Sequence, residues 1–130
     1  MGITVKQSVN NNTYIYSHFA SQWGYQEFSH AISEMIALLN DYGDDTAIIL
    51  DFRDVPEWCT LSMVSYRILV SLSNQYIRHL VFVDMPEAMM NKLLFFLSQR
   101  RNKSLSYHLF FLDDLQEAQD LLDTKIEYRM

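Results

Sequence analysis

Cysteine is nearly absent from this chain, and glycine is scarce. The single cysteine, Cys59, cannot form a disulfide within the chain, and the first residues lack the basic and then apolar run of a secretory signal. We therefore expect a cytoplasmic protein. The three glycines, Gly2, Gly24 and Gly43, are far apart, whereas phosphate-binding loops need glycines close together so that the backbone can approach the anion. Nucleotide-binding loops of the known types are therefore not expected.

The chain also has fewer basic than acidic residues, and it has no long apolar run. The chain carries 10 lysines and arginines against 16 aspartates and glutamates, a formal net charge of -6. Such a chain repels phosphate backbones at long range, so we expect no nucleic-acid partner. Apolar runs such as Leu93–Leu97 are far shorter than the roughly 20 residues that span a bilayer, which argues against integral membrane association.

No group of residues has the spacing of a catalytic or metal site. The four histidines fall on different expected elements, without the spacing of zinc ligands. A Gly-x-Ser-x-Gly elbow is missing, and no Ser/His/Asp set is suggested by position. We therefore expect no metal, no cofactor and no enzymatic activity.

The residues that are present indicate one α/β domain spanning 1–130. Hydrophobic residues make up 49% of the chain and charged residues 20%, as in an ordinary globular protein. Apolar periodicity predicts, in chain order, strands at 3–9 and 13–19, a helix from Gln26, a strand at 47–50, a helix after Thr60, a strand at 80–83, a helix after Pro86, a strand at 107–112 and a helix after Asp114. Strands that alternate with helices favour a mixed, mostly parallel sheet with an N-terminal β-hairpin and about four helices. The unbroken apolar run Ala47–Leu50 predicts a central strand covered on both faces.

Three carboxylates follow expected strands and are candidates for a ligand site. Asp51, Asp84 and Asp113 each come directly after an apolar strand. Parallel α/β sheets usually bind ligands at the edge where the carboxyl ends of their strands meet. Helix capping and solvation are the alternative explanation.

Two further features have both a structural and a functional explanation. Thr60 is expected to cap the second helix, and Cys59 is either a thiol activated by that helix start or a small apolar filler. Several aromatic residues form either a binding surface or part of the core: Trp23, Tyr25, Phe28, Phe52, Trp58 and Tyr66.

The order of elements, together with Ile48–Val55 before a capped helix, resembles the STAS domain, and in particular its divergent SpoIIAA-like group. The later stretch from Leu80–Val83 through Phe110–Asp113 resembles the same group, so the likeness covers nearly the whole chain. STAS domains carry a phosphoacceptor motif, Asp-Ser-Ser/Thr-Gly, at the start of the second helix. Its positions fall on Cys59–Ser62, where the hydroxyl of Thr60 matches the serine.

The resemblance implies a non-enzymatic regulatory domain that binds a protein partner, with Thr60 as a candidate phosphoacceptor. The expected contact surface consists of Asp51, Arg53, Asp54, Trp58, Cys59, Thr60 and Ser62. The alternative is a carrier or sensor of a small apolar or lipid-like ligand, with Trp23, Phe28, Trp58 and helical methionines lining a pocket. A homodimer remains open.

Overall fold

The computed structural model describes residues 2–9, 13–42, 46–57, 61–73, 79–98 and 109–127. Its elements are β1 (Ile3–Val9), β2 (Thr13–Phe19), α1 (Tyr25–Tyr42), β3 (Ala47–Asp51), α2 (Met63–Ser73), β4 (Leu80–Val83), α3 (Glu87–Ser98), β5 (Leu109–Leu112) and α4 (Leu115–Glu127). The predicted order of strands and helices is confirmed. The turn at 10–12, and the first two residues of the strand predicted at 107–112, lie outside the described residues.

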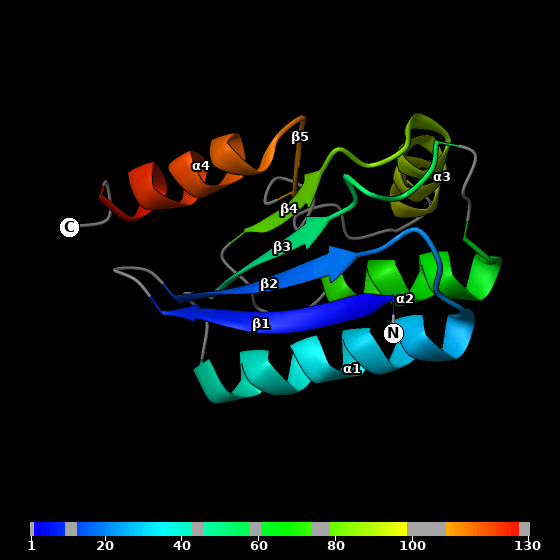
Figure 1. Ribbon diagram of the computed structural model, residues 1–130, viewed down its shortest axis with the longest axis horizontal. Helices are drawn as coiled ribbons and strands as arrows, with labels where there is room; N and C mark the ends of the chain where they lie inside the picture. Colours follow the sequence, from blue (N-terminus) through cyan, green and yellow to red (C-terminus); the bar gives the residue numbers. More distant parts are fainter. Residues whose placement is uncertain are drawn as a thin grey trace.

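The five strands of the described residues form one sheet in which spatial order follows chain order, β1-β2-β3-β4-β5. β1 and β2 pair antiparallel, whereas β2, β3, β4 and β5 pair in parallel. The predicted α/β class, with a mostly parallel sheet, an N-terminal hairpin and four helices, is therefore confirmed. The arrangement is consistent with a SpoIIAA/STAS-like fold. Figure 1 shows α1 and α4 on opposite sides of the strands.

One face of the sheet packs against α1, α2 and α3. Its core joins side chains of the strands with side chains of these three helices. Stacked phenyl rings cross this face from strand to strand: Phe19 lies 4.5 Å from Phe52, Phe52 lies 6.3 Å from Phe82, and Phe82 lies 5.1 Å from Phe111, between ring centroids. Aromatic pairs at such distances add to the burial of their large apolar area.

The other face packs against α4. Ile49, Val81 and Val83 alternate with the residues of the first core, and they lie beneath Ala118 and Leu122 of α4. All five residues of β3 are buried, which confirms the prediction of a central strand covered on both faces. None of the helices within the described ranges has the length and apolar character that a bilayer-spanning segment needs.

Candidate functional site

Polar side chains gather on the α4 side of the sheet, where β2 and β3 end. His18 pairs in register with Asp51, and Tyr16 pairs with Ile49, whose side chain faces α4. Because side chains alternate along a strand, Tyr16, His18 and Asp51 all lie on this face. Arg53 and Asp54 follow in the turn after β3.

The Asp51 carboxylate is the centre of this site, which we call the Asp51 cluster: Tyr16, Asp51 and Arg53. The Asp51 side chain is fully buried, while that of Arg53 is 45% exposed. The hydroxyl of Tyr16 donates to Oδ2 at 2.5 Å. The guanidinium of Arg53 donates from Nε to Oδ1 at 2.9 Å and from Nη2 to Oδ2 at 2.8 Å, and the Arg53 amide donates to Oδ1 at 3.1 Å. A buried carboxylate is tolerated in a fold when it is paired and hydrogen-bonded in this way.

The three groups of the cluster set each other's protonation. Burial alone would raise the pKa of Asp51, but the hydrogen bonds from Arg53 and Tyr16 outweigh it and hold that pKa below its ordinary value. Burial and the bond to the carboxylate raise the pKa of Tyr16 to about 12. The bond to Asp51 raises the pKa of Arg53. Near neutral pH the cluster therefore consists of a carboxylate, a guanidinium and a neutral phenol.

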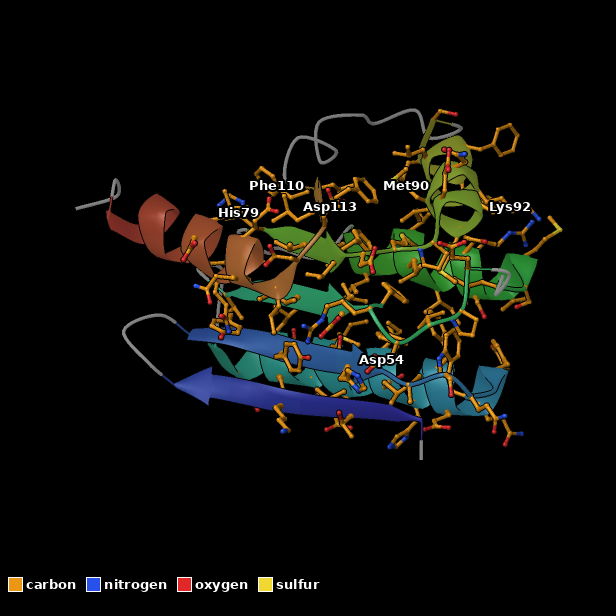
Figure 2. The ribbon with its side chains drawn as sticks, turned by 45° about the horizontal axis from the view of Figure 1, so that its top comes forward. Asp54, His79, Met90, Lys92, Phe110 and Asp113 are labelled. Atoms are coloured by element: carbon orange, nitrogen blue, oxygen red, sulfur yellow. The ribbon has the colours of Figure 1, made fainter. Side chains whose placement is uncertain are left out.

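A second polar pair lies beside the cluster. His18 Nε2 lies 2.6 Å from Asp54 Oδ2, and the two side chains are 30% and 65% exposed. Figure 2 shows Asp54 next to the C-terminal end of β2. This pair lies at the solvent-facing rim of the site, whereas Asp51 lies beneath it.

The loop after Arg53 leads to the start of α2, where the cap differs from the prediction. The hydroxyl oxygen of Ser62 accepts a hydrogen bond from the Ser65 amide at 3.1 Å and donates to the Ser65 hydroxyl at 3.0 Å. The prediction that Thr60 caps this helix was wrong, because α2 begins at Met63 and the residue directly before it reaches the free amide. Thr60 itself lies outside the described residues.

The structure describes four of the seven residues of the predicted contact surface. Asp51 and Arg53 share one cluster, Asp54 pairs with His18, and Ser62 caps α2. Trp58 and Cys59, like Thr60, lie outside the described residues.

The carboxylates that follow β4 and β5 do not join Asp51. Both Asp84 and Asp113 are exposed, and Figure 2 shows Asp113 far from Asp54, near the start of α4. Within the described ranges, no three His, Cys, Asp or Glu side chains gather as a group that could hold a metal ion.

The aromatic residues that were candidates for an apolar pocket pack on one another. Trp23 stacks on Phe28 at 5.7 Å and meets Phe19 edge-on at 5.4 Å between centroids. Phe28 and the α3 residue Met89 are fully buried members of the core. These side chains therefore fill space, and their packing gives the ligand-carrier alternative no support.

Large apolar side chains are exposed on the helices that cover the first face. At the start of α2, Met63 is 61% exposed and Val64 is 50% exposed. Leu94 and Phe95 on α3, and Tyr25 at the start of α1, are exposed as well.

Sequence reasoning missed Met63 and Val64 as candidate contact residues, and it also missed the polar residues Tyr16 and His18. The alternation of β2 was the only signal that placed those two on one face.

Comparison with protein-family models and with curated proteins identified no relative of this chain. No protein-family model matches the chain, and no curated protein matches its sequence closely enough to count as one. The resemblance to STAS domains therefore stays a prediction that rests on the order of elements and on residue patterns.

Proposed function

We propose that this chain is a non-enzymatic regulatory domain of STAS type that acts in the cytoplasm by binding a protein partner. The observation that carries the proposal is the pair of exposed apolar side chains, Met63 and Val64, at the start of α2. They follow directly on the loop that begins with the exposed Arg53 and Asp54. Exposed apolar side chains together with charged residues, within one stretch of the sequence, are the composition of a protein interface.

The protonation of the Asp51 cluster supports binding rather than catalysis. General acid-base catalysts work best with a pKa near the operating pH. The pKa of Asp51 lies below its usual range and that of Tyr16 is about 12, so neither group changes its protonation state near neutral pH. The cluster instead holds the Arg53 side chain in a fixed position at the surface, where it can contact a partner.

Phosphorylation of Thr60 is the proposed switch. Thr60 precedes the N-terminus of α2, where the first amides of the helix favour a negative charge. The position rests on the STAS resemblance, in which Thr60 matches the phosphorylated serine. A phosphate there would add about two negative charges three residues before Met63 and so weaken the contact of the apolar pair with a partner.

Capture of partners from the native host by the full chain tests the surface. The double variant Met63→Ser/Val64→Ser should lose a partner that the wild-type chain retains. The matched control is Leu94→Ser/Phe95→Ser, which removes the same kind of exposed apolar surface from α3 and should retain that partner. Melting temperatures of both variants close to that of the wild-type chain exclude a folding defect. Retention by the α2 variant, or equal loss in both variants, contradicts the proposal.

The switch is tested separately with Thr60→Glu and Thr60→Val. The glutamate should weaken partner binding by at least about tenfold, because it places charge beside a desolvated contact, and the valine should not. Trp58→Ala should weaken the same interaction if the loop takes part. If Thr60→Glu and Thr60→Val bind alike, the phosphorylation switch is wrong, although the contact surface is unaffected.

A further inference from the structure

β1 is an edge strand whose outer side has no strand beside it within the described part of the chain. On its inner side it pairs with β2, with Thr4 opposite His18 and Lys6 opposite Tyr16. The amide of Ala20 donates to the carbonyl of Gly2 at 2.6 Å, which places the even-numbered residues of this stretch in the hydrogen-bonded positions. The backbone groups of Val5 and Gln7 therefore point outward, away from the sheet.

One outward group of this edge already has an acceptor. The amide of Ile3 donates to Oε2 of Glu27, on α1, at 2.7 Å. This bond confirms that the odd-numbered amides point outward. It also occupies the outward amide of Ile3, so a strand added to β1 could bond to outward backbone groups from Val5 onward.

A row of acidic residues on α1 borders the same edge. Glu27, Glu34 and Asp41 are seven residues apart, and residues seven apart recur on nearly the same side of a helix. We call these three residues the α1 acidic row. Since Glu27 contacts β1, the row faces the β1 side of the helix, and its other two members are exposed.

The row runs along the whole edge. From Glu27 to Asp41 the helix rises about 21 Å, and from Ile3 to Val9 an extended strand covers about 20 Å. Figure 1 shows α1 and β1 side by side, running in the same direction. An extended segment added to β1 would therefore lie beside the acidic row over its full length.

We propose that the outer edge of β1 binds an extended basic segment of a partner protein as an added strand. The backbone groups of Val5 and Gln7 hydrogen-bond to the segment, as in other cases of strand addition. Every second side chain of the segment lies on the α1 side, where lysine or arginine meets Glu34 and Asp41. On the α4 side the segment meets the exposed Lys6, so the basic residues belong at alternate positions only. This surface is separate from the start of α2.

A second copy of the chain is a poor occupant of this edge. Two β1 strands paired about a two-fold axis would place both α1 helices on the same side of the extended sheet. The two acidic rows would then face each other across the junction, and each chain carries a net charge of -6. Like charges in that position are destabilising.

A short peptide with alternating lysine and threonine, blocked at both ends, tests the proposal by calorimetry and amide hydrogen exchange. We expect saturable binding that weakens with added salt, together with slower exchange of the Val5 and Gln7 amides. The same peptide with glutamate in place of lysine should not bind. Tight binding of the glutamate peptide, no binding of the lysine peptide, or unchanged exchange at Val5 and Gln7 overturns the proposal.

Matched variants separate strand addition from attraction of a basic peptide to an acidic protein. Glu34→Gln/Asp41→Asn should weaken binding by at least about tenfold. The control Glu117→Gln/Asp120→Asn removes the same charge from α4 and should leave binding unchanged. Gln7→Pro removes an outward amide that the folded sheet does not use, and should also weaken binding. The variant Met63→Ser/Val64→Ser should bind the peptide normally, so failure of the α2 surface leaves this result intact.

Two methylated peptides complete the test. In the first, the alternate backbone amides of the lysine peptide that face β1 are methylated, which removes their hydrogen bonds and should abolish binding. In the second, the other backbone amides are methylated, and binding should persist. If both peptides bind alike, the contact is general charge attraction and the proposal is wrong.

Discussion

The two faces of the sheet are stabilised in different ways, although the same strands supply both. On the face covered by α1, α2 and α3, the buried side chains are mainly apolar, and the phenyl row runs from Phe19 on β2 to Phe111 on β5. On the face covered by α4, the core is smaller, and a buried carboxylate, Asp51, lies at the end of β3. The difference shows that one helix covers less of a face than three do. The part of this face that α4 does not cover can hold the Asp51 carboxylate, because Arg53 pairs with it and reaches solvent.

The largest expected effect on stability comes from the face covered by α1, α2 and α3. Phe52→Ala removes a fully buried ring that stacks on Phe19, so the free energy of unfolding should fall by about 3–5 kcal/mol. Urea unfolding followed by circular dichroism measures the change. The control Phe95→Ala deletes an exposed ring and should change stability by less than about 0.5 kcal/mol. Similar losses in the two variants would mean that the phenyl row is not the core of this face.

Removal of the buried carboxylate should have a smaller effect. Asp51→Ala deletes the acceptor of Tyr16 and Arg53, and we expect a loss of about 2 kcal/mol in urea unfolding. The loss stays below that of a fully buried ion pair because water can solvate the half-exposed Arg53. A loss as large as that of Phe52→Ala would show that the two faces contribute alike.

The Asp51 cluster should also make the free energy of unfolding depend on pH, at both low and high pH. The pKa of Asp51 is lowered in the fold, so its contribution is present above the unfolded value of about 3.9 and is lost as the pH falls through the lower folded value. The pKa of Tyr16 is raised to about 12, so its contribution is present below about pH 10 and is lost as the pH rises toward 12. Unfolding in urea across this range measures both losses.

The variant Tyr16→Phe identifies the source of the alkaline loss. It should remove the loss between about pH 10 and 12, because phenylalanine has no proton to release. Asp51→Ala should reduce the same loss, since the carboxylate helps to raise the pKa of Tyr16. An alkaline loss that persists unchanged in Tyr16→Phe would assign it to other groups.

The smallest effect is expected at the rim of the polar face. Asp54→Asn removes the negative charge from the pair with His18, but both side chains contact solvent, so stability should change by less than about 1 kcal/mol. Thermal unfolding at low and high salt measures this change. A larger loss would show that the rim contributes to the fold as strongly as the buried Asp51.

Local patterns predicted the elements of this fold but not the partners of its polar site. The apolar run at 47–50 predicted a strand covered on both faces, which β3 is. The cap of α2 was placed two residues too early, because the first helical residue decides which side chain reaches a free amide. Thr60 and Ser62 both have a capping hydroxyl, so residue type alone does not distinguish them.

The Asp51 cluster depends on which strands lie side by side. Arg53 is close to Asp51 in the sequence, and both were expected at one surface. Tyr16 and His18 come from another strand, and their position follows from the register of β2 against β3, which no local pattern specifies. Asp51 was expected to face a partner directly, whereas it is buried and reaches the surface only through Arg53.

The agreement between chain order and strand order has a consequence for biosynthesis. A ribosome delivers β1 to β5 in the order in which they pair, so each new strand finds its neighbour already made. The helices α1, α2 and α3 emerge between these strands and cover their face as it forms. Ile49, Val81 and Val83 stay uncovered until α4 emerges, after all five of these strands. A nascent chain that stalls before α4 thus presents this apolar strip to chaperones.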